Sequence, residues 1–294
     1  MGKHKPDVIF PIVHGTFGED GTLQALLDIY GKPYVGSGVL ASALCMDKVL
    51  SSELVEKHGL LIPKIIRQNQ SGTFLLTNEE GNSRQSARMI LPKRALRSLG
   101  EAWVVKPRAS GSSVGVSIVR KKSELARALR LASKESEPMV QEMIVGIEVT
   151  CTVLDFPKAK LSRKFSFRAL PVTEIIPDPK VAKFFDYKAK YTKGGSLEVT
   201  PARISPALTK AIQQASILAH QLLGCRHISR SDFIISTQMI GHSMSNHLGK
   251  VYYLETNTAP GMTDTSLVPQ SAQVAGLPMP ELVHQLIQGA CFIF

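Results

Sequence analysis

The amino-acid sequence predicts an α/β protein whose 294 residues form one large domain or two to three small ones. Two observations underlie this prediction, the first for the fold class and the second for the division into domains. Apolar runs of strand length alternate along the chain with helical patterns of apolar residues. A polar segment at residues 68–85 separates the N-terminal elements from the rest, and it is the best candidate for a domain boundary.

The N-terminal part contains four expected elements. Residues 7–13 form a continuous apolar run that predicts a strand. Residues 19–30 predict an amphipathic helix, and a turn with a short strand follows at residues 31–36. Residues 39–58 predict one long helix that ends at Gly59, because glycine commonly ends a helix.

The later elements predict an antiparallel layer with a flexible loop. They are strands at residues 103–107 and 114–119, a helix at 122–133, strands at 139–144 and 148–154, and helices at 205–223 and around 281–287. Neither a G-x-G-x-x-G pattern nor a P-loop motif occurs, so this layer is not a Rossmann unit.

The composition is that of a soluble globular protein, with 44% hydrophobic and 20% charged residues. No apolar run approaches the length of a membrane span, and the run at residues 8–13 is too short for a secretory signal core. The four cysteines show no metal or redox spacing, so we expect reduced, mostly buried thiols in a cytoplasmic protein.

The net charge of +11 raises the possibility of nucleic-acid binding. The basic residues are spread over residues 93–97, 120–130 and 158–164, however, without interleaved aromatic residues. No nucleic-acid motif is present. We therefore expect solvated basic faces and a site for a small anionic molecule, with neither nucleic acid nor membrane as a partner.

The most informative residues are Arg230 and Asp232, followed by Glu255 and Asn257. Arg230 and Asp232 are two residues apart, so on a strand they point to the same face. An isolated acid at a strand end is usually a solvated charge, and an isolated Asn is usually a turn residue. Here the buried strand expected at residues 251–254 is followed directly by Glu255 and Asn257, so neither of these residues is isolated. Oxygen donors of this kind suit Mg²⁺, and a cation beside them suits a reaction with developing negative charge.

The loop at residues 106–115 offers Lys106, free backbone N–H groups and three hydroxyls. Such a loop has little side-chain bulk and many donors, so it can close over phosphates. The alternative is a plain hairpin connection, which glycine- and serine-rich loops usually are. The lysine on the preceding strand favours phosphate binding.

Several motifs together resemble one family. They are His14-Gly-x-x-Gly18-Glu-Asp-Gly21, Tyr34-Val-Gly-Ser-Gly38 through Met46-Asp-Lys48, Val105-Lys-Pro107 with Gly111-Ser-Ser-Val-Gly115, Phe185-Asp-Tyr-Lys-Ala-Lys190-Tyr191, Leu223-Gly-Cys225, Arg230-x-Asp232 and Glu255-x-Asn257-Thr-x-Pro-Gly-Met-Thr263. From Asp7 onward the sequence resembles the D-alanine–D-alanine ligases of the ATP-grasp superfamily.

The resemblance implies an α+β ATP-grasp fold. Residues 1–46 would be the remnant of a truncated N-terminal α/β substrate-binding domain. Residues 47–146 would be the central lobe with the glycine-rich loop, and residues 147–294 the C-terminal lobe with the metal and substrate site. The implied reaction joins two D-alanine molecules through an acyl phosphate at the expense of ATP, for peptidoglycan synthesis.

The resemblance also implies residue roles. The implied ATP-binding residues are Lys48, Lys106 and Lys190 at the phosphates and Gln141, Ile144 and Glu148 around the nucleoside. The implied ligands of two Mg²⁺ or Mn²⁺ ions are Asp232, Glu255 and Asn257. Arg230 and the N–H of Gly261 would stabilise the oxyanion, and Ser112 and Tyr191 would link the glycine-rich loop to a mobile loop. His14 would line the first D-alanine, and Ser266 and Leu267 the second.

The sequence departs from the family pattern in four places. Gln141 replaces a glutamate that faces the adenine amino group, and Phe185 replaces a common tyrosine. The connection at residues 236–250 is longer than usual. The sequence begins about fifty to sixty residues into the pattern. No residue fills the role of the family's N-terminal glutamate, and we expect exposed apolar surface in the remnant.

Three hypotheses follow. The chain is an active ligase, which would form a homodimer if its N-terminal domain is complete. It is an ATP-grasp ligase for another amino or hydroxy acid. Or it is a catalytically impaired remnant that still binds Mg-ATP.

Overall fold

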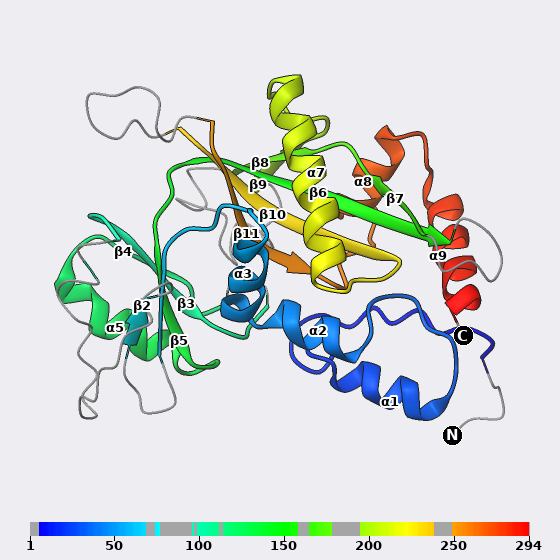
Figure 1. Ribbon diagram of the computed structural model, residues 1–294, viewed down its shortest axis with the longest axis horizontal. Helices are drawn as coiled ribbons and strands as arrows, with labels where there is room; N and C mark the ends of the chain where they lie inside the picture. The colour runs from blue at the N-terminus through cyan, green and yellow to red at the C-terminus, as the bar shows by residue number, and fades with distance from the viewer. Residues whose placement is uncertain are drawn as a thin grey trace.

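The computed structural model describes residues 6–68, 74–76, 96, 99–111, 114–157, 165–177, 195–237 and 249–293. Two antiparallel sheets form its centre, and helices cover them (Figure 1). The mixture of helices and antiparallel sheets confirms the predicted α+β class.

The smaller sheet has five strands. Their order is β2 (Phe74–Leu76), β1 (Ile65–Gln68), β5 (Pro138–Glu142), β3 (Trp103–Pro107) and β4 (Ser117–Val119). Helix α5 (Lys122–Ala132) packs on it at the left of Figure 1, and its apolar face at Leu125, Ala128 and Leu129 meets Val105 and Val140 of the sheet. The pairing of β3 with β4 and with β5 is antiparallel, as predicted for this layer.

The larger sheet has six strands. Their order is β11 (Val251–Asn257), β10 (Ile228–Ser236), β6 (Gly146–Pro157), β8 (Thr173–Pro177) and β9 (Ser196–Val199), with β7 (Phe165–Ala169) also paired to β6. The helices of this half are α7 (Pro206–Leu222), α8 (Leu267–Val274) and α9 (Met279–Ile293).

The long strand β6 separates two cores, because its alternate side chains point to opposite faces. Val149 and Cys151 belong to the core that also contains Ile212 of α7. Leu154 belongs to the core formed with Leu282 and other apolar residues of α8 and α9. Glu148 and Thr150 share the face of Leu154, so this face carries polar residues at one end and an apolar core at the other.

Three helices form the N-terminal part: α1 (Thr22–Tyr30), α2 (Val39–Met46) and α3 (Lys48–Lys57). In Figure 1, α1 and α2 lie below the larger sheet. The prediction of a single helix at residues 39–58 is wrong, because Asp47 adopts an extended conformation and separates α2 from α3. Its carboxylate accepts hydrogen bonds from the N–H groups of Val49 and Leu50, so Asp47 caps a new helix.

The strand predicted at residues 7–13 is also absent from the described structure. Only Ile9 pairs, in an isolated parallel bridge with Tyr34. Its N–H donates to Pro33 O, and its carbonyl accepts from Val35 N. Pro11 follows two residues later and has no N–H to continue the ladder. The short strand expected within residues 31–36 is likewise reduced to this bridge at Tyr34. The C-terminal helix is longer than the predicted core at 281–287, and the remaining predicted elements that the structure describes lie within a few residues of their expected bounds.

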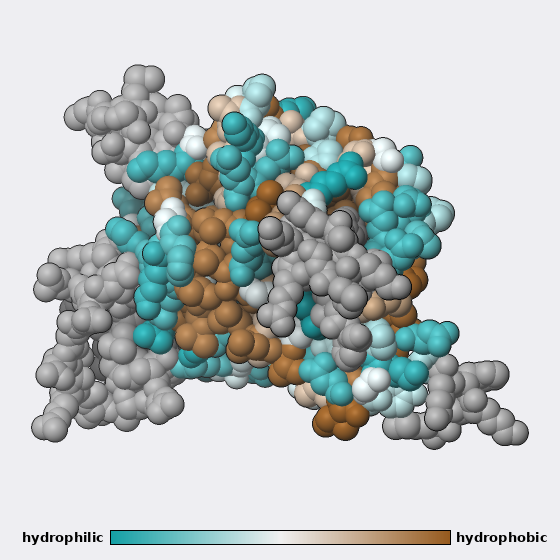
Figure 2. All heavy atoms as spheres, turned by 45° about the vertical axis from the view of Figure 1, so that its right-hand side comes forward, coloured by the Kyte–Doolittle hydropathy of each residue, from teal (hydrophilic) through white to brown (hydrophobic). Residues whose placement is uncertain are grey.

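Several large apolar side chains of the N-terminal part are exposed, as expected from the sequence. Ile29 and Leu40 are 84% and 80% exposed, and Ile12 and Leu26 are more than half exposed. Figure 2 shows one face of the molecule, on which apolar side chains gather between hydrophilic margins.

The four cysteines are free thiols, and all except Cys291 are buried, as predicted. None of the helices that the structure describes combines the length and the apolarity that a membrane span requires. The division of the chain after residues 46 and 146 stays a prediction.

Candidate active site

Strand pairing brings the four most informative residues together. Arg230 on β10 lies opposite Asn257 on β11, and Asp232 lies opposite Glu255. Residues directly opposite on neighbouring antiparallel strands project to the same face. The register shifts immediately after Asp232, which ends this paired stretch. Arg230 and Asp232 therefore share one face of the larger sheet, as predicted, and the strand register adds Glu255 and Asn257 to that face.

Asp232 holds Arg230 by two hydrogen bonds. Nε of Arg230 donates to Oδ1 at 3.0 Å, and Nη2 donates to Oδ2 at 3.1 Å. Burial favours a lower pKa for Arg230, but the charge and hydrogen bonds of Asp232, with Glu255 and Glu19 nearby, raise that pKa overall. Arg230 is therefore a permanent, desolvated positive charge.

Thr150 on β6 also holds Asp232. Its hydroxyl Oγ1 donates to Oδ1 of Asp232 at 2.6 Å, from the strand on the other side of β10. Sequence reasoning missed Thr150. The sequence pattern that could have indicated Thr150 is its two-residue spacing from Glu148, because residues two apart on a strand project to the same face.

The three predicted metal ligands fit a hard cation in chemical type. Asp232 and Glu255 supply carboxylates, and Asn257 supplies an amide. The amide nitrogen of Asn257 lies 3.5 Å from Oδ2 of Asp232. Among the described residues no cluster of three or more His, Cys, Asp or Glu side chains gathers, so an oxygen site here needs the asparagine or a ligand's own oxygens.

A cleft opens between the two sheets on this face. Its mostly apolar lining with a few polar groups suits a small-molecule site. The predicted site residues that line it are Lys48, Lys106, Gln141, Ile144, Glu148, Asp232 and Glu255. Val104, Ile118 and Leu254 contribute apolar walls. Lys190 and Tyr191 lie outside the described residues.

The side chain of Gln141 is a polar group in this cleft that is only partly satisfied by the part of the chain that the structure describes. The amide nitrogen of Gln141 is buried and finds no hydrogen bond among the described residues. Buried polar groups in folded proteins are almost always paired, so a group such as this one is open to a ligand.

Lys48 enters the cleft at the start of α3. Its Nζ donates to the carbonyl of Ser110 at 2.5 Å and lies 3.5 Å from Oε2 of Glu255. Its backbone N–H donates to the carbonyl of Arg108. Lys48 therefore joins the glycine-rich loop to the oxygen donors of β11.

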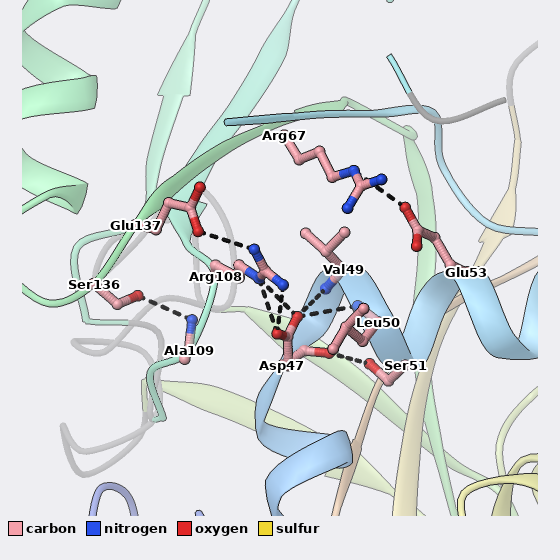
Figure 3. A network of polar contacts seen from close by, with 10 residues as sticks. All are labelled: Asp47, Val49, Leu50, Ser51, Glu53, Arg67, Arg108, Ala109, Ser136 and Glu137. Atoms are coloured by element: carbon pink, nitrogen blue, oxygen red, sulfur yellow. Dashed lines mark hydrogen bonds and ion pairs between the residues drawn. The ribbon is translucent and has the colours of Figure 1, made fainter. Parts of the chain in front are cut away.

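Figure 3 shows the polar network that fixes this position. Arg108 donates through Nε to both oxygens of Asp47 at 2.9 Å, and its Nη1 donates to Glu137 at 2.9 Å. These bonds, led by those to Asp47, raise the pKa of Arg108. The N–H of Ala109 donates to Ser136. The cap of α3 and the root of the glycine-rich loop thus form one unit.

The glycine-rich loop reaches the N-terminal turn. A Cβ placed on Gly111 would meet Cα of Gly15 at 3.2 Å, so the absence of a side chain allows this close approach. Ser112 lies outside the described residues. The contact joins the loop to the turn that carries His14.

A smaller space of about 330 Å³ continues from the cleft, since Lys48, Ser110 and Glu255 line both. Glu19 and Asn257 also line it. Glu19 belongs to the motif from His14 to Gly21, in which His14 alone had a predicted role. A glutamate in a glycine-flanked turn was the available signal.

Glu19 is held inside this turn. It accepts a hydrogen bond from the N–H of Gly15 at 2.6 Å. Burial raises the pKa of Glu19, and the Gly15 N–H, His14 and Arg230 oppose that rise. The carboxylate thus faces the same charged region as the strand residues.

The remaining predicted residues lie after β11. His14 Nδ1 is 2.9 Å from the carbonyl of Ala259. A Cβ on Gly261 would approach Oγ of Ser266 to 2.7 Å, so a side chain here would make the serine move. Ser266 precedes α8 as its N-cap residue, and Leu267 begins the helix. The hydroxyls of Ser266 and Thr263 lie 2.7 Å apart.

Comparisons with known proteins agree with this geometry. Residues 73–288 match the family profile described as D-ala D-ala ligase C-terminus, and residues 2–37 match the one described as D-ala D-ala ligase N-terminus. The D-alanine–D-alanine ligase of Leptospira interrogans is 41% identical over 283 residues, which are 96% of this chain and 72% of the relative. That of Syntrophobacter fumaroxidans is 40% identical over 286 residues, 97% of this chain and 80% of the relative.

Solved structures give the same result. The VanG D-Ala:D-Ser ligase of Enterococcus faecalis has a TM-score of 0.74 and 32% identity, covering 98% of this chain and 74% of that one. The D-alanine–D-alanine ligase of Bacillus anthracis, complexed with ATP, has a TM-score of 0.71 and 31% identity, covering 98% and 80%. By sequence and by structure, the chain belongs to the D-alanine–D-alanine ligase family.

Proposed function

We propose that this chain uses ATP to join two D-alanine molecules into D-alanyl-D-alanine, the reaction for which its relatives are named. One observation carries the proposal. Asp232 and Glu255 line the same cleft as Lys48 and Lys106, and Arg230 is hydrogen-bonded to Asp232. A cleft with cations, oxygen donors and an apolar wall suits a nucleotide that transfers a phosphoryl group.

The reaction would proceed in two steps. A carboxylate oxygen of the first D-alanine attacks the γ-phosphorus of ATP, which gives an acyl phosphate and ADP. The amine of the second D-alanine then attacks the acyl carbon, the C–O bond to phosphate breaks, and the amine loses a proton. The products are the dipeptide, ADP and phosphate. The dipeptide would serve peptidoglycan synthesis.

The chain's own residues deal with the charge that gathers in these steps. Lys48 and Lys106 would bind the phosphates. Arg230 and the N–H of Gly261 would stabilise the oxyanion of the second step, where one well-placed donor contributes a few kcal/mol. Because Asp232 and Thr150 hold their partners in place before substrate arrives, Arg230 needs little reorganisation.

Two divalent ions, Mg²⁺ or Mn²⁺, would be held by Asp232, Glu255 and Asn257. When bound, they would neutralise phosphate oxygens that these protein ligands leave accessible. The other roles proposed from the family are nucleoside contacts by Gln141, Ile144 and Glu148, a third phosphate contact by Lys190, and loop contacts by Ser112 and Tyr191. His14 would line the first D-alanine, and Ser266 and Leu267 the second.

Gln141 supports nucleotide binding in particular. Its side chain is 3% exposed, and its amide nitrogen has no partner among the described residues. An adenine base would offer this amide both an acceptor and a donor. We further propose the three-part division after residues 46 and 146, and a homodimer formed through the N-terminal part.

The deciding experiment measures phosphate release from Mg-ATP by the purified chain with D-alanine, with L-alanine as the control. Release with D-alanine alone, together with a dipeptide detected by mass spectrometry, is expected. D-Serine and D-lactate arms test for another acceptor, since one structural relative is a D-Ala:D-Ser ligase. Faster turnover with either would replace the proposed acceptor.

A second measurement, thermal stability, tests the hypothesis of a catalytically impaired chain that still binds Mg-ATP. Mg-ATP should raise the thermal midpoint of the chain because it binds only the folded state. Stabilisation by Mg-ATP with no phosphate release from any acceptor would contradict the proposed reaction and leave a nucleotide-binding protein.

A further inference from the structure

Two cysteines from distant parts of the chain meet beneath the cleft. Cys45 is in the last turn of α2, and Cys225 follows the end of α7. Their sulfur atoms are 3.7 Å apart, although the residues are 180 positions apart in sequence. Both are reduced. A disulfide has a sulfur–sulfur distance of about 2.05 Å, so the pair is short of a bond by less than two ångströms.

The other two cysteines of the chain are unlike this pair. Cys151 is buried, donates to the backbone carbonyls of Thr152 and Leu170, and has its pKa raised by burial to about 12. Cys291 is exposed on α9. Cys151 is therefore an inert buried thiol and Cys291 a solvent-facing one, and the two serve as internal references for the pair.

The surroundings of Cys225 favour its thiolate. The pKa of Cys225 is lowered, first by the hydrogen bond with Cys45 and then, against burial, by nearby His220, Ser37 and Ser229. The ring of His220 is itself held by Ser229 at 2.7 Å and by Asp155 at 3.2 Å. The same hydrogen bond, together with burial, raises the pKa of Cys45, so Cys225 is the thiolate of the pair and Cys45 the thiol.

Cys45 is reached from the active cleft. It lines the smaller space beside Lys48, Glu255 and Asn257. A small oxidant such as a peroxide would enter from the cleft, whereas bound nucleotide and ions would fill the entrance at Lys48 and Glu255. Oxidation should therefore be fast in the empty enzyme and slow in the occupied one.

We propose that Cys45 and Cys225 form a peroxide-sensitive dithiol whose conversion to a disulfide switches the enzyme off. One thiolate sulfur attacks a peroxide oxygen, the O–O bond breaks, and a sulfenic acid forms while hydroxide leaves and takes up the proton that this thiol had released, which gives water. The second thiol attacks the sulfenic sulfur, the S–O bond breaks, and the thiol proton leaves in a second water. The sulfurs lose two electrons in all, and the peroxide oxygens gain them.

The position of Cys45 explains why the bond would lower activity. Cys45 is two residues before Asp47 and three before Lys48. Bringing the sulfurs to bonding distance moves the end of α2 toward the turn at Cys225, and Asp47 begins the next helix immediately. The effect on turnover rests on the proposed function, but the thiol chemistry does not.

The test uses the full chain with Cys291→Ser, which removes the exposed thiol and leaves three. The reduced protein is exposed to hydrogen peroxide, alkylated, weighed intact and digested. Two of the three thiols should disappear, a peptide linking Cys45 to Cys225 should appear, and Cys151 should remain alkylatable. Mg-ATP should slow the reaction.

Activity is measured in parallel. Phosphate release should fall about tenfold on oxidation, in line with the cost of moving a site residue by a fraction of an ångström to an ångström. Dithiothreitol should restore it, which it does not do for oxidised methionine. The Cys45→Ser, Cys291→Ser variant should keep its activity in peroxide.

The outcomes separate this proposal from the proposed reaction. If Cys45 and Cys225 can still be alkylated after exposure to peroxide, the proposed peroxide-sensitive dithiol is wrong. A linked peptide with unchanged turnover would overturn the switch. If the reduced chain shows no D-alanine-dependent turnover, stabilisation by Mg-ATP becomes the readout, and equal stabilisation of the reduced and disulfide forms would likewise overturn it.

Discussion

Two parts of the site, which meet where Nζ of Lys48 lies 3.5 Å from Oε2 of Glu255, are built in different ways, and we call them its strand-built end and its side-chain-built end. At one end, Arg230, Asp232, Glu255 and Asn257 are fixed by the register of two paired strands. At the other, Lys48 is fixed by side chains, because the pair of Asp47 and Arg108 ties a helix cap to a loop. In paired strands, many backbone hydrogen bonds together hold each residue in its position. A side-chain tie depends on single groups, so the second end should be the easier one to displace.

The largest expected effect is at the strand-built end. Asp232→Asn keeps the shape of the side chain but removes the charge that holds Arg230 and would hold an ion. We expect activity to fall more than about a hundredfold, since even outer-shell partners of a metal ligand cost 10- to 100-fold. Phosphate release is the measurement, with circular dichroism to establish folding. Normal Mg²⁺-dependent turnover in this variant would remove Asp232 from the site.

A smaller effect is expected at the side-chain-built end. Asp47→Asn keeps a good helix cap but breaks the ion pair with Arg108. Lys48 should shift, and the apparent KM for ATP should rise about tenfold, because sub-ångström to ångström displacements cost up to about 100-fold. Initial rates over a range of ATP concentrations measure this.

Arg67→Gln is the matched control for that variant. It breaks another ion pair of Figure 3, between Nε of Arg67 and Glu53 at 3.3 Å, but Arg67 is more than a third exposed. Exposed pairs contribute about 0–1 kcal/mol, so little change is expected. Equal effects of Asp47→Asn and Arg67→Gln would mean that the network does not position Lys48.

A severalfold effect is expected just beyond β11. Gly261→Ala would place a Cβ 2.7 Å from Oγ of Ser266, so the serine must move. Overpacking of this kind costs about 1–3 kcal/mol where the neighbours are fixed. The apparent KM for D-alanine should rise more than that for ATP. Equal rises in the apparent KM for D-alanine and in that for ATP would show that the substitution disturbs the whole cleft and not the D-alanine site in particular.

The last expected effect is on stability in acid and not on turnover at neutral pH, and it tests whether the strand-built end is fixed at low pH. His227 immediately precedes β10, is buried, and accepts a hydrogen bond from the N–H of Gly36. Burial lowers its pKa from 6.5 to about 4, although Asp155 opposes this. Between these values the unfolded state binds the proton and the folded state does not, so stability is full above pH 6.5 and is lost as pH falls toward 4.

The variant for this test is His227→Asn, since asparagine tolerates the positive φ of 63° at this position. The wild-type chain should lose about 3 kcal/mol more than the variant between pH 6.5 and 4, from the shift in pKa. Urea unfolding at several pH values measures this difference. Parallel curves for the two proteins would show that His227 titrates normally in the folded state.

Much of the strand-built end could be predicted from sequence. The two-residue spacings of Arg230 with Asp232 and of Glu255 with Asn257 fix their faces through the geometry of a strand alone. The side-chain-built end could not be predicted in this way. The apolar pattern at residues 39–58 is continuous, and only the contact with Arg108 shows why Asp47 interrupts it.

The sequence by itself therefore determined which chemical groups the protein offers and how neighbours in the chain are oriented, because both follow from local covalent geometry. The tertiary structure decided which distant groups meet. It brought Thr150 to Asp232, Glu19 to the charged end of the cleft, and Cys45 to Cys225. Such contacts arise from the packing of whole elements, and no spacing in the sequence encodes them.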